Sequence, residues 1–217
     1  MHLIMFDIDG TLVDSSPLHG RLLKDAIEAE LGCGIDNNWA GYRHMTDSGI
    51  VAEILERHDL HDSTVVIAER IRSRFVEAFH AHLHSAAGSV LEVPGARDLV
   101  QALLGRPDVR VAVATGGWSG AAMLKLRAIG LDPAGFAFAS GCDAPARTQI
   151  MSIAECRAMK ANTARRRTYF GDGPWDQRAS AELGYQFICI GSRVECELAF
   201  PDFRDHDAVL QALSLTA

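Results

Sequence analysis

Two acidic residues near the start of the chain are the first candidates for chemistry. Asp7 and Asp9 follow the apolar run 3–6, which predicts a short buried strand ending in a polar loop. In extended chain, residues two apart project to the same side. Like charges at this spacing repel unless a cation or a shared proton compensates. Gly10 lets the chain turn, and Thr11 can cap that turn or bind an anion.

Polar residues also follow two later apolar runs. Thr115 and the glycines 116–117 come after the run 109–114, and Asp172 comes after 168–170. A hydroxyl and free backbone N–H groups at the start of a helix form an anion site, although a Thr-Gly-Gly stretch is more often only a turn. Because ligands of parallel sheets bind at the carboxyl ends of strands, we expect these groups to meet Asp7 there.

The elements that must position these groups alternate from residue 95 onward. Strands are expected at 109–114, 136–139, 168–170 and 187–190, with helices at 96–104, 119–129, 145–159, 175–183 and 205–213. Such alternation predicts an α/β fold, with a Rossmann-like parallel sheet and helices on both faces.

The segment 15–90 has a different character, with helical periodicity and almost no strand signal. Three amphipathic helices are predicted: one ending before Gly32, one capped by Thr46 or Asp47, and one from about Ser63 to Leu83. The chain therefore divides into an α/β core, 1–14 and 91–217, and a small all-helical domain, 15–90. The connections 14–17 and 91–95 are expected to be hinges.

Composition limits the classes of protein that fit. The chain has 217 residues, enough for one core and a small accessory domain, and its net charge of −7 argues against a nucleic-acid partner. No apolar run reaches the length of a membrane span, and no signal peptide is recognisable. Five scattered cysteines without a C-x-x-C pair indicate reduced thiols. We expect a cytoplasmic protein that binds no membrane.

The run from Asp7 to Leu12, D-I-D-G-T-L, closely resembles the first motif of the haloacid dehalogenase superfamily, D-x-D-G-T-L. Most members are magnesium-dependent phosphatases and phosphomutases. Thr115 resembles the second motif, an apolar strand that ends in Ser or Thr. Gly171 to Asp176 resembles the family's G-D-x-x-x-D motif, and the segment 15–90 stands where the family has a cap domain. The resemblance covers the whole chain.

The family also has a cation, usually Lys and sometimes Arg, near the start of a helix before the last acidic motif. Arg147 fits this position, because it follows Pro145 at the expected distance before Asp172. Lys160 ranks second, because it lies much closer to Asp172 and ends the predicted helix. Arg147 can supply the same charge and can bind two phosphate oxygens at once.

The resemblance implies a phosphatase acting on a small-molecule phosphate monoester through an aspartyl-phosphate. Asp7 is the expected nucleophile, and Asp9 the acid that protonates the leaving oxygen and later the base that activates water. Mg²⁺ is expected to bind the side chains of Asp7 and Asp172 and the carbonyl of Asp9, with Asp176 acting through water or fixing the loop. The groups expected to bind the phosphate oxygens are Thr115, Gly116 and Arg147.

Other functions remain open on the sequence. A sugar phosphomutase would have the same motifs, and a non-catalytic binding protein on this fold is a third reading. Asp9 argues against dehalogenation, because dehalogenase-like members lack that second acid. Lys24 lies too early in the insert for the Schiff base of a phosphonatase. His80 and His84 have the i, i+4 spacing of metal ligands, but no third ligand is evident.

Specificity is expected to come from the segment 15–90, in polar residues that face the core. The candidates cluster before the second predicted helix and include groups that can bind hydroxyls or an anion: Tyr42, Arg43, His44 and Thr46. An ordinary solvated loop is the alternative for this stretch.

Overall fold

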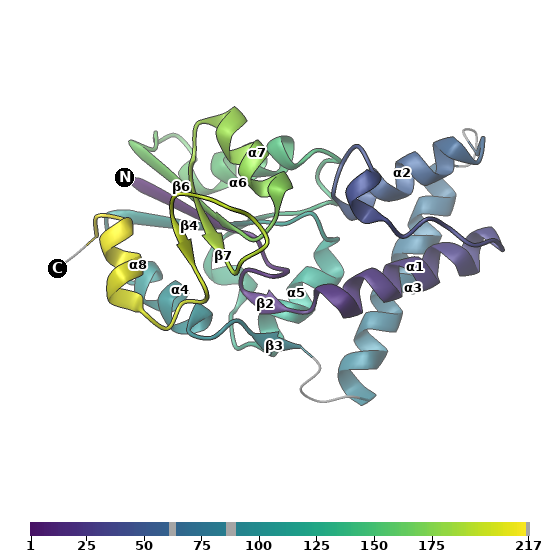
Figure 1. Cartoon of the computed structure of the whole chain (residues 1–217), viewed down its shortest axis with the longest axis horizontal. Helices are drawn as coiled ribbons and strands as arrows, with labels where there is room; N and C mark the ends of the chain where they lie inside the picture. The colour runs from purple at the N-terminus through teal and green to yellow at the C-terminus, as the bar shows by residue number, and fades with distance from the viewer. Residues whose placement is uncertain (61–63, 86–89, 216–217) are drawn as a thin grey trace.

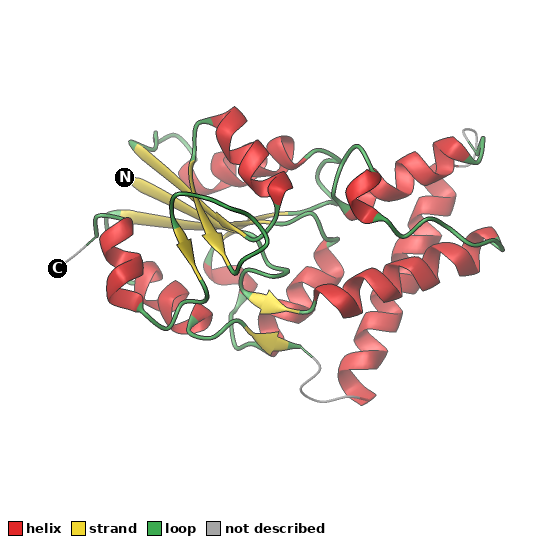
Figure 2. Cartoon of the chain, viewed as in Figure 1, coloured by secondary structure: helices red, strands yellow, loops and turns green. Residues whose placement is uncertain are grey.

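A six-stranded sheet forms the centre of the computed structural model, which describes residues 1–60, 64–85 and 90–215. All of its strand pairs are parallel, and the strand order is β5-β4-β1-β6-β7-β8 (Figures 1 and 2). The strands are β1 (His2–Phe6), β4 (Val109–Ala114), β5 (Ala137–Ala139), β6 (Arg166–Gly171), β7 (Gln186–Ile190) and β8 (Ala199–Phe200). The Rossmann-like parallel sheet predicted from the alternation is confirmed.

Strand β1 is central because it is buried along its whole length, with His2 followed by four apolar residues. Its side chains alternate between two apolar cores, with Ile4 and Phe6 in one and Leu3 and Met5 in the other. Such burial on both faces is typical of a parallel sheet covered by helices. The Phe6 ring also stacks on Phe170 of β6, with 4.8 Å between ring centroids, which ties the two strand ends together.

Helices cover both faces of the sheet. The core that holds Phe6 also contains apolar residues of α4 (Ala96–Leu104), α5 (Ser119–Ala128) and α8 (His206–Ala212). The core that holds Met5 contains residues of α6 (Arg147–Met159) and α7 (Pro174–Leu183).

None of the helices in the described parts of the chain combines the length and the apolar character that a membrane span requires.

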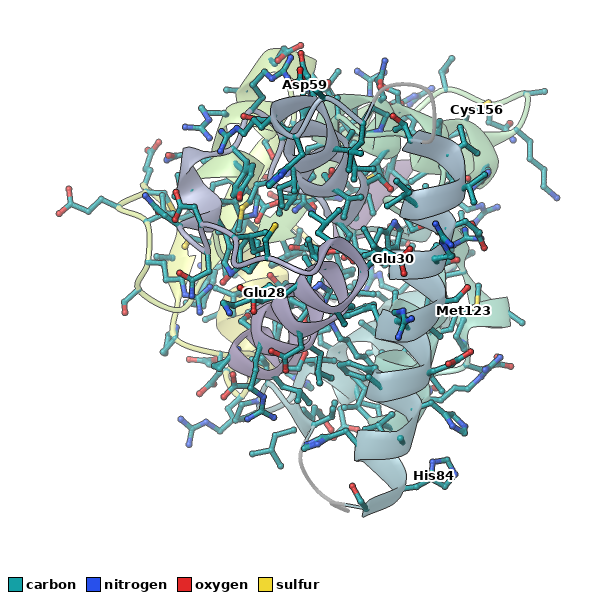
Figure 3. All side chains as sticks on the ribbon, turned by 90° about the vertical axis from the view of Figure 1, so that its right-hand side faces the viewer. Glu28, Glu30, Asp59, His84, Met123 and Cys156 are labelled. Carbon is teal, nitrogen blue, oxygen red and sulfur yellow. The ribbon has the colours of Figure 1, made fainter. Side chains whose placement is uncertain are left out.

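A group of helices, called here the helical insert, lies beyond the carboxyl ends of the strands (Figure 1). It comprises α1 (Ser16–Leu31), the 3₁₀ turn η1 (Trp39–Gly41), α2 (Asp47–Arg57) and α3 (Thr64–Ser85). The Thr46 hydroxyl accepts a hydrogen bond from the Gly49 N–H and caps α2, as the sequence predicts. Glu30 of α1 pairs with Arg70 and Arg74 of α3, between the two helices in Figure 3. Ser63, where the third helix was expected to begin, lies outside the described residues.

The connections between the sheet and the helical insert pair with each other. Strand β2 (Val13–Asp14) and strand β3 (Leu91–Glu92) form a small antiparallel sheet, in which Val13 faces Glu92 and Asp14 faces Leu91. The sequence predicted only loops here, and it also missed β8. All three strands have two residues, too few for a period-two pattern to show.

Candidate active site

Three neighbouring strand ends bring the predicted polar groups together. Phe6 of β1 is in register with Val113 of β4 and Phe170 of β6, so the chain leaves all three strands at the same level. Asp7 then follows β1, Thr115 follows β4 and Asp172 follows β6, and all three side chains are buried. The backbone N–H of Asp7 donates to the Phe170 carbonyl and fixes the first of these turns.

Gly10 permits a close approach between two of these loops. Its φ of 82° lies in the left-handed region, and a Cβ at this position would stand 2.0 Å from Oδ2 of Asp172. Only a residue without a side chain can therefore let the loop after β1 lie against the loop after β6. The glycine of the first motif thus controls the separation of Asp7 and Asp172.

Three buried carboxylates form an acidic cluster. Asp7, Asp172 and Asp176 each offer an oxygen within 4.8 Å of the others. Among the residues described, Asp172 Oδ1 has no hydrogen-bond donor, and the partner of Asp7 Oδ1 is a guanidinium rather than an N–H of the loops. Burial, with the nearby Asp7 carboxylate, raises the pKa of Asp172 to about 7, and burial raises the pKa of Asp176 as well. Crowded, buried carboxylate oxygens, among them Asp172 Oδ1 without a hydrogen-bond donor, are the donor set that a hard cation such as Mg²⁺ prefers, so the residues present fit that ion.

Two arginines border the acidic cluster. Nη1 of Arg147, the first residue of α6, lies 3.1 Å from Asp7 Oδ1 and 3.4 Å from Asp176 Oδ1. Arg193, in the loop after β7, pairs with Asp172 Oδ2 at 2.7 Å. Arg147 therefore places a buried cation beside both Asp7 and Asp176. Sequence analysis missed Arg193, because a lone loop arginine gives no motif.

The second acid of the first motif has a different environment. Asp9 is not part of the acidic cluster, and both of its oxygens lie 2.6 Å from the Nζ of Lys125 in α5. The Ser15 hydroxyl donates to Oδ1 at 2.5 Å. Burial opposes ionisation, but the Lys125 ammonium and the His19 imidazole outweigh it and lower the pKa of Asp9 to about 2. Asp9 is thus paired with Lys125, whereas Asp7 belongs to the acidic cluster and is paired with Arg147.

The helical insert contacts this environment directly. His19 of α1 lies 2.6 Å from Lys125 through Nδ1 and 2.8 Å from Asp47 through Nε2. Asp47, the first residue of α2, accepts from the backbone N–H of Trp118 at 2.8 Å and donates its own N–H to the Gly116 carbonyl. Sequence analysis missed Lys125 and His19. The only signal was a basic residue among apolar neighbours in each helix, which is usually a side chain that reaches solvent.

A cavity of about 550 Å³ lies between the helical insert and the strand ends. On the sheet side it is lined by Asp7, Asp9, Thr115, Gly116, Gly117, Arg147, Trp175 and Arg193. On the insert side the lining includes His19, Arg21, Lys24, Asn37, Trp39, Thr46, Asp47 and Ile50. The volume suits a small metabolite.

The four predicted specificity residues separate in the structure. Thr46 lines the cavity, but its hydroxyl donates to the Pro145 carbonyl. Tyr42 is buried and donates to the Asp36 carbonyl, whereas Arg43 pairs with Glu53 and Glu56. His44 is exposed, and neither it, Tyr42 nor Arg43 is among the residues that line the cavity.

Two weaker candidates also lie away from the cavity. Lys160 is an exposed residue at the end of α6 and does not line the cavity, so Arg147 is the cation that the fold brings to Asp7. His84 stands near the far end of α3, and its Nδ1 lies 2.8 Å from the His80 carbonyl (Figure 3). In the described part of the chain, the group of side chains able to hold a metal is the acidic cluster.

Comparison of fold shows what this chain resembles. A hydrolase from Pseudomonas syringae superposes with a TM-score of 0.75 at 20% identity, over 98% of this chain and 99% of that one. CbbY from Rhodobacter sphaeroides, in complex with phosphate, gives 0.67 at 20% identity over 94% and 95%. The β-phosphoglucomutase of Clostridium difficile gives 0.72 at 14% identity over 98% and 96%.

Comparison of the sequence with family models identifies the family. No curated protein matches the chain. The family model for haloacid dehalogenase-like hydrolases matches residues 4–180, from within the buried strand that precedes Asp7, through Asp172 and Asp176, into α7. That span includes each motif on which the predicted resemblance depends, in the predicted order. The chain belongs to the haloacid dehalogenase-like hydrolase family.

Proposed function

We propose that this protein is a magnesium-dependent phosphatase that hydrolyses a small-molecule phosphate monoester through an aspartyl-phosphate on Asp7. One observation carries the proposal: Asp7, Asp9, Thr115 and Arg147 line the same covered cavity. A nucleophile, a proton-transfer group and phosphate-binding donors therefore face one small volume.

The first step is attack on phosphorus by a carboxylate oxygen of Asp7, in line with the leaving oxygen. The Thr115 hydroxyl, the loop at Gly116 and the Arg147 guanidinium bind the non-bridging oxygens. Bound Mg²⁺, held by Asp7, Asp172 and the Asp9 carbonyl with Asp176 beside them, would offset the charge between Asp7 and an anionic phosphate. Asp176 also fixes the loop, because its carboxylate accepts from the Gly173 N–H.

Asp9 transfers protons in both halves of the reaction. Ionised Asp9 is ready for the second step, in which it takes a proton from the water that hydrolyses the phosphorylated Asp7. In the first step the leaving oxygen receives its proton through Asp9: the Lys125 ammonium, hydrogen-bonded to both Asp9 oxygens, supplies it and is left as the neutral amine. The proton that Asp9 takes from water in the second step restores the ammonium.

We propose further that residues 15–90 act as a cap domain on a core of 1–14 and 91–217. The residues of the helical insert that line the cavity support this role, since they cover Asp7 and limit access of bulk water. A cavity of about 550 Å³ accommodates a small phosphate ester and excludes a folded phosphoprotein. Brisk turnover of an intact phosphoprotein would contradict the cap.

The experiment that tests the proposed function is a phosphate-release screen over a broad panel of metabolite phosphates, with and without Mg²⁺. We expect release from some small esters only when Mg²⁺ is present. A phosphomutase is the second candidate, favoured by the fold shared with β-phosphoglucomutases. Isomerised sugar phosphates among the products would identify it. No release and no isomerisation from any ester would favour the non-catalytic reading.

Replacing Trp39 by alanine is expected to change KM and the ranking of substrates. Trp39 lines the cavity, and its indole packs across Gly20, where a Cβ would stand 3.0 Å from Nε1. Its removal enlarges the substrate side of the cavity without touching the acidic cluster. The same panel, with Mg²⁺-dependent thermal stabilisation as a second readout, measures the effect.

Arg43→Ala is the matched control, because Arg43 belongs to the same stretch but pairs with Glu53 and Glu56 outside the cavity. The control should leave the ranking unchanged. If Arg43→Ala changes the ranking of substrates and Trp39→Ala does not, the loop at 42–44 determines specificity.

A further inference from the structure

A lysine is enclosed between the sheet and the helical insert. The side chain of Lys125 is 1% exposed, and its Nζ lies 2.6 Å from Asp9 Oδ1, Asp9 Oδ2 and His19 Nδ1. The ring of Phe79, from α3, lies 5.1 Å from the same nitrogen. Burying an ammonium is costly unless its hydrogens are bonded, and here three acceptors surround it.

The contacts also define how His19 is hydrogen-bonded. An ammonium has no lone pair to accept a bond, so His19 Nδ1 accepts from Lys125. Nε2 then carries the ring hydrogen and donates to Asp47 Oδ1 at 2.8 Å. The second oxygen of Asp47 accepts from the Trp118 N–H, at the start of the helix that carries Lys125.

These bonds form a chain from the proton-transfer group to the phosphate-binding loop. It begins at Asp9 in the core, passes through Lys125 to His19 and Asp47 of the helical insert, and returns to the Gly116 carbonyl through the Asp47 N–H. Two of its members belong to the insert. The complete chain therefore exists only while the insert covers the strand ends.

Asp9 is held in one orientation by this arrangement. Lys125 binds both carboxylate oxygens, and the Ser15 hydroxyl binds Oδ1 from another direction. The Asp9 side chain keeps 20% of its surface exposed and lines the cavity. An acid held by buried partners, with one side open to substrate, is preorganised for proton transfer.

We propose that Lys125 is a positioning residue for Asp9, which it holds toward the leaving oxygen, and that His19 and Asp47 complete this support when the helical insert closes. The inference rests on the proposed phosphatase function. It assigns a role to three side chains that the four motifs do not include.

The role has a chemical signature. As Asp7 forms its bond to phosphorus, the bond from phosphorus to the leaving oxygen breaks, and the electron pair goes to that oxygen. Asp9 delivers the proton that this oxygen takes, and the Lys125 ammonium hydrogen-bonded to Asp9 replaces it. A basic leaving group such as phenolate needs that proton more than p-nitrophenolate, which is stable as an anion. Misplacing Asp9 therefore slows phenyl phosphate more than p-nitrophenyl phosphate.

The test compares kcat/KM of Lys125→Met on these two aryl phosphates, because kcat/KM reports the step that releases the aryl group, whereas hydrolysis of phosphorylated Asp7 is common to both. We expect kcat/KM for phenyl phosphate to fall about 10- to 100-fold more than kcat/KM for p-nitrophenyl phosphate. The ratio does not depend on how much of the sample is folded, because both substrates meet the same enzyme. Lys160→Met, at an exposed position away from the cavity, should leave the ratio unchanged.

A second variant keeps the test valid if Lys125→Met does not fold. His19→Leu removes the third acceptor of the ammonium and the link to Asp47 but leaves the Lys125–Asp9 pair. It should also slow phenyl phosphate more than p-nitrophenyl phosphate, but by a smaller factor than Lys125→Met. An equal loss on both substrates in the folded variants overturns the positioning role and leaves the phosphatase standing. A wild-type enzyme without activity on these or any other esters overturns the proposed function instead.

Discussion

Asp7→Asn is expected to abolish phosphate release, with a loss on the order of 10³-fold or more. The amide is a poor nucleophile, so the covalent route through residue 7 is closed. Asparagine has the same shape as aspartate, so the fold at the end of β1 should be retained. What is lost is the negative charge that Arg147 contacts at 3.1 Å. Initial rates on the best substrate of the panel measure the loss.

A second measurement separates loss of the nucleophile from loss of the site. Intact-protein mass spectrometry after rapid acid quench should find a phosphorylated fraction in the wild type and none in Asp7→Asn. Asp25→Asn is the matched control, because Asp25 is an exposed acid of α1 and does not line the cavity. Substantial turnover by Asp7→Asn on any ester that the wild type hydrolyses would refute the assignment.

Asp172→Ala is expected to weaken Mg²⁺ binding by about 10- to 100-fold or more, and chelation should silence the wild type reversibly. Asp172 supplies one of the carboxylates of the acidic cluster, and its Oδ1 has no donor among the described residues. The readout is the Mg²⁺ concentration that gives half of the thermal stabilisation, which does not depend on turnover. Glu195→Ala, in an exposed loop outside the cavity, is the control.

The pH dependence of the same titration has a definite sign. Burial and Asp7 raise the pKa of Asp172 to about 7, so below that pH a proton occupies the carboxylate that Mg²⁺ requires. Mg²⁺ affinity should therefore increase as the pH rises through about 7 and then level off. Asp172→Ala should flatten this rise. Affinity independent of pH in the wild type, or hydrolysis that survives chelation, would remove Asp172 from the metal site.

The sequence located those parts of the candidate site that depend on local order. Asp7, Thr115 and Asp172 each follow an apolar strand, and parallel pairing puts such ends side by side whatever the rest of the chain does. Arg147 was found through its place at the start of a helix. The sequence predicted these positions because a strand or helix end is visible in the chain itself.

Lys125 and His19 could not be predicted in the same way. They lie far apart in the sequence, and only the packing of α1 against the sheet domain brings their nitrogens to 2.6 Å. Tyr42 and Arg43 illustrate the converse. Their types suit substrate binding, yet the path of the chain before α2 buries one ring and turns the other side chain to Glu53 and Glu56. The direction of a loop side chain depends on tertiary packing, which no short pattern records.

The pairing of β2 with β3 makes the helical insert a replaceable module. Seen from the sheet, the chain departs at Asp14 and returns at Leu91, and these residues are partners in the antiparallel pair. Adjacent ends of antiparallel strands can be joined by a turn of about two residues. A chain with such a junction can accept a shorter or longer insert there without a change in the path of the strands that lead to its carboxylates.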